Sequence, residues 1–277
     1  MYLADYHVHS TCSPDGHCTM SRMAEAAVAH GLQEICITDH LDTVEWGTYA
    51  PRTAFDWAEA VRQAEEAREK WGNRLTIRLG AELGEAALSF ERADKLLADA
   101  PELDFVIGSV HMMGPRFGHE DLYYIPKADE PYYHDVIDDY LDDVLALSRW
   151  GRFQVLGHLT LPVRYIWDNA GIKMDFSDHL DRVEEIFRTI IPRGVGIECN
   201  TKPGRHPPAG RDDPAALPPD GRRGHHRRLR RPQHRLCGLP RQGDPGAAEE
   251  LRLPLFHHVY QGKTGVPAPL IGKERDP

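Results

Sequence analysis

Short apolar runs alternate with longer amphipathic stretches over residues 1–200. The short runs predict strands, and the stretches with apolar positions three and four residues apart predict helices. The expected strands are 2–8, 34–38, 75–81, 105–110, 153–157 and 195–198. The expected helices are 20–30, 54–71, 89–98, 133–150 and 178–193. Strands that alternate with helices predict βαβ units and therefore a parallel sheet.

Six such units favour a barrel-like arrangement over a sandwich. The alternation stops near residue 202. Residues 204–277 hold 12 of the 21 prolines and 14 Lys/Arg against 8 Asp/Glu, whereas the preceding residues carry 19 Lys/Arg against 35 Asp/Glu. We therefore expect a barrel domain over 1–203 and an Arg/Pro-rich segment of different character over 204–277.

The formal net charge of −10 argues against a general nucleic-acid binder, which would show a basic surface. The N-terminal residues have neither the basic region nor the apolar run of a secretory signal. No stretch approaches the roughly 20 apolar residues that span a bilayer. The five cysteines are an odd number without a framework spacing. These features predict a soluble cytoplasmic protein with no membrane and no nucleic-acid partner.

Candidate metal ligands stand at the end of every expected strand. In chain order they are His7 and His9, Asp39 and His40, Glu82, His111, His158, and Glu198. Residues i and i+2 of a strand point the same way, so the first two histidines can reach one ion together. A single histidine at a strand end is more often a satisfied polar residue than a ligand. Six strand ends in register indicate a metal centre, because the carboxyl ends of barrel strands converge on one face.

Mixed imidazole and carboxylate ligands favour Zn, Fe or Mn over Ca or Mg. If one carboxylate bridges, such a cluster holds two or three divalent transition-metal ions roughly 3.5–4 Å apart, an arrangement that activates water and stabilises phosphoryl oxygens. Other chemistries fit less well. The chain has no G-x-S-x-G elbow, and the segment 262–265 lacks the first half of a phosphate-binding loop.

These motifs together resemble those of the polymerase-and-histidinol-phosphatase (PHP) superfamily, in particular its histidinol-phosphate phosphatase branch. The matching segments cover about residues 1–201. They are Asp5-Tyr-His-Val-His-Ser10, Ser13-Pro-Asp-Gly16, Ile37-Thr-Asp-His40, Gly80-Ala-Glu82, Gly108-Ser-Val-His111, Gly157-His158 and Glu198-Cys-Asn-Thr201. The resemblance implies a distorted (β/α)7 TIM-like barrel with a metal site at the strand ends. It implies hydrolysis of L-histidinol phosphate, a small phosphomonoester, by a metal-bound hydroxide, as in histidine biosynthesis.

The resemblance also implies a role for each ligand. His7 and His9 would hold a first ion with Glu82, and Glu82 would bridge to a second ion held by His111 and His158. A third ion would lie on Asp15 and His40, with His17 near enough in sequence to compete with Asp15. Asp39 would support His40 from outside the metal shell. These are also the groups expected to carry the catalysis: His7, His9, Glu82, His111 and His158.

Two arginines are candidates for the substrate phosphate. Arg205 matches an arginine that follows the Asn-Thr motif in this branch, and Arg164 lies six residues after His158. A guanidinium binds a phosphate bidentately, although an exposed structural arginine is an equally good interpretation of each. In the loop 114–131, Glu120 or Asp121 is a candidate contact for the substrate amine.

The sequence departs from the family pattern after residue 201. The superfamily ends with a strand that carries Gly-Ser-Asp-Ala-His, and residues 202–277 contain no such motif. If the codons are read one base forward with CGN for arginine, Arg228–Gln233 permits that motif, so we interpret the segment 204–277 as a frame-shifted remainder of the barrel. A real basic tail, largely disordered, is the alternative. As written, the barrel would lack its last strand–helix unit and two ions would each lose a ligand, so the activity of the literal chain is in question.

Two other functions stay open at this point. The same metal site would serve a PHP-type phosphoesterase acting on nucleotides or other small phosphoesters. A non-catalytic protein that binds an anionic partner through Arg222–Arg235 is the third hypothesis, and it predicts salt-sensitive binding.

Overall fold

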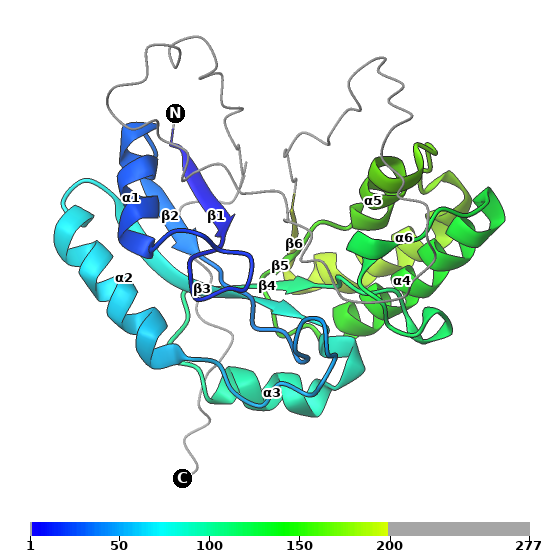
Figure 1. Ribbon diagram of the computed structural model, residues 1–277, viewed down its shortest axis with the longest axis horizontal. Helices are drawn as coiled ribbons and strands as arrows, with labels where there is room; N and C mark the ends of the chain where they lie inside the picture. The colour runs from blue at the N-terminus through cyan, green and yellow to red at the C-terminus, as the bar shows by residue number, and fades with distance from the viewer. Residues whose placement is uncertain (1, 199–277) are drawn as a thin grey trace, which may run out of the picture.

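The computed structural model describes residues 2–198. Among these residues, six parallel strands form one sheet whose spatial order is their order in the chain. The strands are β1 (Ala4–Val8), β2 (Glu34–Ile37), β3 (Thr76–Gly84), β4 (Phe105–Ser109), β5 (Val155–Leu156) and β6 (Gly196–Ile197). Every neighbouring pair is parallel. The sheet curls with its helices on the outside, and the result is an open half-barrel (Figure 1).

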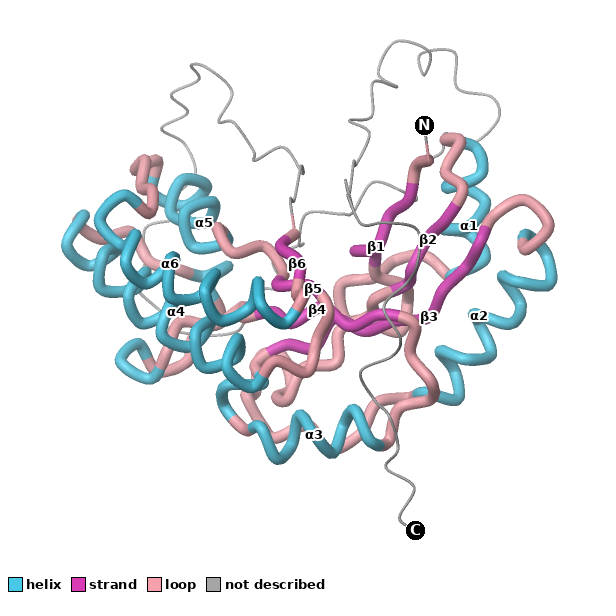
Figure 2. Tube along the Cα trace, turned by 180° about the vertical axis from the view of Figure 1, so that it is seen from behind, coloured by secondary structure: helices cyan, strands magenta, loops and turns pink. Residues whose placement is uncertain are grey.

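Six helices and five short 3-10 turns connect the strands. The helices are α1 (Met20–Ala29), α2 (Trp57–Trp71), α3 (Phe90–Ala98), α4 (Glu130–Trp150), α5 (Leu161–Ala170) and α6 (Leu180–Ile190). The 3-10 turns are Ala86–Leu88, Pro115–Phe117, Leu122–Tyr124, Ser177–His179 and Ile191–Arg193. Helices α1 and α2 pack together outside β1–β3, while α4, α5 and α6 form a group at the other end of the sheet (Figure 2). No helix among residues 2–198 is long and apolar enough to cross a membrane.

Local sequence sets where these helices begin and end. Thr19, Asp56, Ser89 and Asp129 each accept the backbone N–H three residues on, which caps α1, α2, α3 and α4. Helix α4 ends at Gly151, whose φ of 70° lies in the left-handed region that favours glycine. The capping side chains satisfy amide groups that a helix cannot pair internally.

The core lies between the sheet and these helices. All four residues of β2 are buried, as expected for a strand covered on both faces. Helices α1 and α2 contact each other and both contribute small buried residues to the core; they include Ala24, Ala27, Ala60 and Ala64. Helix α4 contributes two fully buried aromatic rings, Tyr133 and Tyr140.

The α/β class, the parallel sheet and its six strands are as predicted. The sequence prediction missed α5, and it began α4 at residue 133, whereas the helix begins at Glu130 with Pro131 in its first turn. The expected helix 178–193 is α6 with a 3-10 turn at each end. Within residues 2–198 the sheet stays open between β1 and β6. The expectations for 204–277 lie outside the described residues.

Candidate metal centre

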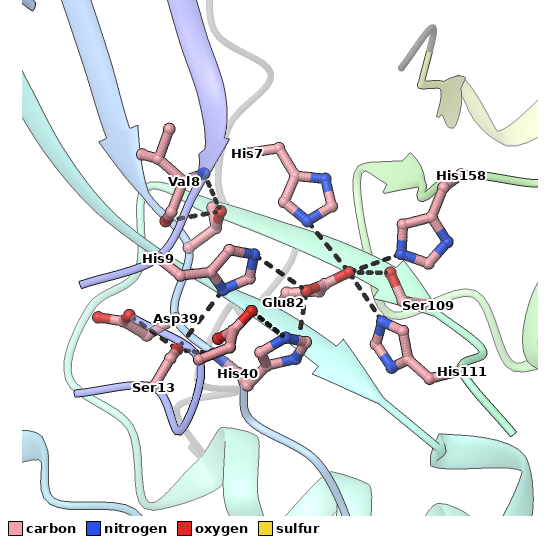
Figure 3. Close-up of polar contacts among 12 residues, drawn as sticks. His7, Val8, His9, Ser13, Asp39, His40, Glu82, Ser109, His111 and His158 are labelled. Carbon is pink, nitrogen blue, oxygen red and sulfur yellow. Dashed lines mark hydrogen bonds and ion pairs between the residues drawn. The ribbon is translucent and has the colours of Figure 1, made fainter. Parts of the chain in front are cut away.

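Glu82, on β3, lies at the centre of five histidines (Figure 3). Its side chain is 1 % exposed. Its Oε1 lies 3.1, 2.9 and 3.2 Å from Nε2 of His7, His158 and His111. Its Oε2 lies 3.5 Å from Nε2 of His9 and 3.2 Å from Nδ1 of His40. One buried carboxylate therefore joins imidazoles from four other strand ends.

Close pairing of neighbouring strands brings these side chains together, and small residues allow that pairing. An isolated parallel bridge between His40 and Glu82 continues the β2–β3 pairing past the end of β2. A Cβ at Gly157 would lie 2.4 Å from Oγ of Ser109, so glycine is required for β5 to approach β4 just before His158. Ser109 in turn donates a 2.7 Å hydrogen bond to Glu82 Oε1.

Three sets of side chains have ligand atoms close enough to share an ion. They are His7, Glu82 and His158; His9, Asp15 and His40; and His40, Glu82 and His111. All seven predicted metal-site residues fall in these sets. The partition differs from the one that the resemblance implies, because His9 groups with Asp15 and His40, while His158 groups with His7.

The residues fit a group of transition-metal ions. Two ligands of a tetrahedral ion, at about 2.0–2.2 Å from the metal, lie roughly 3.4 Å apart, close to the spacings around Glu82. Nδ1 of His158 is buried and has no hydrogen-bond partner among the described residues. A protein rarely buries a polar atom without a partner, so a water molecule or another group is expected to pair with this nitrogen, while Nε2 of the same ring faces Glu82 and is the atom available to an ion. Imidazole and carboxylate donors suit Zn, Fe or Mn.

The electrostatics of the metal-free site depend on the carboxylates. Burial alone would lower the pKa of His7 and of His111, but Glu82 and a second carboxylate near each ring raise it well above the usual value. For His40, burial is likewise outweighed by Asp42 and Glu82, which raise the pKa to about 10. These imidazoles bind protons where they would bind metal, so metal and protons compete for the site.

The pKa values of two other histidines, His9 and His158, are lowered instead of raised. Burial, together with the neighbouring His40, lowers the pKa of His9 well below its usual value. Burial also lowers the pKa of His158, although Glu82 opposes the effect. Both rings are therefore neutral at pH 7, the form in which an imidazole nitrogen can bind a metal ion.

Asp39 is placed to hold the loop after β1. It accepts hydrogen bonds from the backbone and hydroxyl of Ser10 and from the hydroxyl of Ser13. The hydroxyl oxygen of Ser13 accepts the backbone N–H of His40 at 2.7 Å. Asp39 thus supports His40 through Ser13 rather than by touching its ring. His17 is exposed and belongs to none of the three sets formed by described residues.

Sequence reasoning missed two buried carboxylates behind the histidines, Asp42 and Glu85, and it did not predict the contact that a third, Glu198, makes. Glu85 Oε1 lies 3.1 Å from Nδ1 of His111, and Asp42 Oδ1 lies 3.4 Å from Nδ1 of His40. Glu198 was noted only as a strand-end residue; its Oε1 lies 2.7 Å from Nδ1 of His7. The signal available in the sequence was the short spacing of Asp42 and Glu85 from motif residues.

The structure describes three of the four residues predicted to contact the substrate. Arg164, on α5, lies over the ring of Tyr165 at 4.6 Å, and it forms no ion pair with a described residue. Asp121 accepts the backbone N–H of Tyr123 and so caps a 3-10 turn, while Glu120 is exposed. Arg205 lies outside the described residues.

An open parallel α/β barrel with imidazole and carboxylate ligands at its strand ends defines a metal-binding protein of the barrel class. The family model of the PHP domain matches residues 5–202. The chain belongs to the PHP domain family.

Proteins similar to this chain include named histidinol-phosphatases. The chain is 29 % identical over 202 residues to the histidinol-phosphatase of Lactococcus lactis, covering 72 % of this chain and 71 % of the relative. It is 28 % identical over 212 residues to a Deinococcus radiodurans protein named "Probable histidinol-phosphatase", covering 75 % and 76 %. The crystal structure of the Lactococcus lactis histidinol phosphate phosphatase, complexed with zinc, L-histidinol and phosphate, superposes with a TM-score of 0.59. That match has 23 % identity and covers 71 % of this chain and 72 % of the other.

Proposed function

We propose that this protein is a metal-dependent phosphomonoesterase that hydrolyses L-histidinol phosphate to L-histidinol and phosphate. The observation that carries the proposal is the Glu82 carboxylate at the centre of five histidines. The names of the Lactococcus lactis and Deinococcus radiodurans relatives support the substrate. We place the reaction in the cytoplasm, on the sequence features given above.

The metal-holding residues in this proposal are those of the three sets: His7, His9, Asp15, His40, Glu82, His111 and His158. When bound, two or three Zn, Fe or Mn ions supply an activated water and positive charge for the phosphoryl oxygens. Glu82 offers an oxygen to each side of the cluster, as a bridging carboxylate does. Zinc in the solved relative supports the choice of metal.

The protein's own residues bind and orient the substrate. The strand ends bury the cluster, so bulk water is largely kept from the reacting phosphate and charges there act strongly. Arg164, a cation without a described carboxylate partner, is proposed to hold the phosphate, with Arg205 as the second candidate. Tyr165 supports Arg164 by the contact of its ring face with the guanidinium.

The test is phosphate release by the purified full-length chain loaded separately with Zn, Mn and Fe. The substrates are L-histidinol phosphate, a nucleoside monophosphate and a simple aryl phosphate at equal concentrations. We expect L-histidinol phosphate to be turned over with the highest kcat/KM. A preference for the nucleotide would instead favour the alternative phosphoesterase function. Metal uptake without hydrolysis of any of the three would refute the phosphatase proposal.

The variant Arg164→Met tests the phosphate contact. Removal of a guanidinium that binds phosphate should raise KM at least tenfold, because charge-assisted hydrogen bonds are worth about 1.5–3 kcal/mol. Arg116→Met is the matched control, because Arg116 is a half-exposed arginine that pairs with Asp135 on α4. An unchanged KM in the Arg164 variant would assign that residue a structural role.

We also propose that 204–277 is a frame-shifted remainder of the same domain. Resequencing of the gene across codons 195–277, with the intact mass of the expressed protein, tests this directly. A missing or extra base near codons 202–210 would restore Gly-Ser-Asp-Ala-His and a complete metal site. If the sequence stands, salt-sensitive binding of an anionic polymer that depends on Arg222–Arg235 tests the tail hypothesis.

A further inference from the structure

Two histidines of the metal centre each contact a second, outer carboxylate. The Nε2 atoms of His7 and His111 face Glu82, at 3.1 and 3.2 Å. Their Nδ1 atoms face away from it. Nδ1 of His7 lies 2.7 Å from Oε1 of Glu198, and Nδ1 of His111 lies 3.1 Å from Oε1 of Glu85. Each ring therefore lies between an inner and an outer carboxylate.

Glu85 is held at this position against its backbone preference. Its φ of 60° and ψ of 27° place it in the left-handed region, which residues other than glycine rarely adopt. Its side chain is 4 % exposed. The same Oε1 also accepts the backbone N–H of His111 at 2.7 Å, and Thr43 donates its hydroxyl to the Glu85 carbonyl. Glu85 is buried, has an unfavourable backbone conformation and contacts both the ring and the backbone N–H of His111. This combination indicates a functional role.

Glu198 likewise makes two contacts, one at each of two strand ends. Its side chain is 2 % exposed. While Oε1 contacts the ring of His7 at the end of β1, Oε2 accepts the backbone N–H of His158 after β5, at 2.6 Å. Glu198 therefore links the ring of His7 to the backbone that carries His158.

We propose that Glu85 and Glu198 are positioning residues that fix the protonation pattern of His111 and His7. A neutral imidazole carries one N–H and one lone pair, and a carboxylate accepts but does not donate. Each outer carboxylate therefore places the proton on Nδ1 and leaves the lone pair on Nε2, the nitrogen that faces the metal cluster. Outer carboxylates of this kind typically change metal affinity 10–100-fold. The inference rests on the metal site proposed above.

The first measurement is the tautomer of His7 and His111 in the zinc-loaded, full-length protein. Long-range proton–nitrogen spectra of histidine-labelled protein distinguish Nδ1–H from Nε2–H rings. We expect both rings to carry the proton on Nδ1 and to bind zinc through Nε2. Either ring bound through Nδ1 would overturn the proposal for its carboxylate, and this result does not depend on a variant that folds.

The second measurement is zinc affinity by competition with a chelator. Glu85→Ala and Glu198→Ala should each weaken zinc binding about 10–100-fold. The glutamine variants keep an acceptor oxygen, so they should recover most of that loss. Glu34→Gln and Glu34→Ala are the controls, because Glu34 is also a buried carboxylate but lies at the opposite end of the sheet, and they should leave zinc affinity unchanged.

The outcomes separate this inference from the proposed function. Folded alanine variants that bind zinc as the wild type does would overturn the positioning role and leave the metal centre intact. Equal losses in the alanine and glutamine variants would also overturn it, because a tautomer effect requires rescue by the acceptor. A wild-type chain that takes up no zinc would remove the metal centre and this inference with it.

Discussion

The two ends of the same parallel sheet carry very different polar networks. At the amino ends of β2 and β3, Glu34 accepts hydrogen bonds from the hydroxyls of Tyr2 and Tyr6 and from the guanidinium of Arg78. Arg78 also pairs with Asp104 at 3.1 Å. Each charge there has a partner of opposite sign or a donor. At the carboxyl ends of the strands, five imidazoles surround the single carboxylate of Glu82.

The carboxyl end keeps a buried atom without a partner among the described residues. Nδ1 of His158 forms no hydrogen bond with any of them. Such atoms reduce the stability of a metal-free protein, because a buried polar group without a partner costs roughly 1–3 kcal/mol. The difference teaches that the amino end is arranged for stability and the carboxyl end for binding, as in barrel enzymes generally.

The largest test of this contrast is Glu82→Gln. Loss of the central charge should weaken zinc binding by more than the roughly 100-fold that outer partners contribute, and phosphatase activity should fall at least as much. In the metal-free protein, unfolding free energy should drop by about 3–5 kcal/mol, because His7, His40 and His111 lose their buried counter-charge. Chelator competition and urea unfolding measure the two effects. Retention of wild-type zinc affinity would refute the central role of Glu82.

The second-largest effect is expected from metal removal, which should change the unfolding free energy through the carboxyl end of the sheet and not through the amino end. With free zinc at 100 times its Kd, binding adds about 2.7 kcal/mol to the unfolding free energy, and a chelator should remove that amount. Glu34→Gln should lose the same increment as the wild type, since its network lies away from the metal. Urea unfolding with and without chelator gives both values. A smaller increment in the Glu34 variant would show that the two networks are coupled.

The amino end should respond to substitution through stability alone. Glu34→Gln weakens the hydrogen bonds from Tyr2, Tyr6 and Arg78 and should cost about 1–3 kcal/mol. Burial opposes the shift, but these donors lower the pKa of Glu34 below its ordinary value. The stabilisation is therefore present above the ordinary pKa and is lost as pH falls through the lowered one. Unfolding measured from pH 7 down to pH 3 should show a variant deficit that is full at pH 7 and shrinks as the pH falls.

The smallest expected effect lies on α4, behind the site. Burial, together with the charges of Glu85, Asp139 and Asp142, raises the pKa of Asp143 to about 7. A raised carboxyl pKa destabilises the fold as pH rises from about 4 to 7, so Asp143→Asn should gain about 1 kcal/mol at pH 8, discounted for partial solvent exposure. At pH 4 the variant and wild type should unfold alike. An equal gain at both pH values would contradict the assigned charge effect.

Most of the fold was predictable from hydrophobic period and turn residues, because six strands and five helices have clear apolar patterns. Helix α5 was missed since Pro162 lies in its first turn and aromatic residues follow. Proline is tolerated there because the N–H it lacks would have no partner in a helix. The extent of strands β5 and β6, two residues each, depends on pairing with neighbours that no local pattern reveals.

The candidate site was predictable as a set of residues but not as a geometry. The strand-end rule brought together His7, His111 and His158, because parallel strands align their carboxyl ends. It did not predict that the oxygens of Glu82 divide the histidines as they do, since that depends on one side-chain rotamer. The roles of Glu85 and Glu198 depend on a left-handed backbone and on a contact between β1 and β6, neither of which has a sequence signature.

The contact between His7 and Glu198 has a consequence for the folding pathway. The two residues are 191 positions apart in the chain. A contact of such separation closes a very long loop, and proteins dominated by such contacts fold slowly. The first and last described strands must therefore both be in place before the ligands at this end of the sheet are complete. The rate of zinc binding during refolding would then report the last folding step, which follows formation of the local α1–α2 pair.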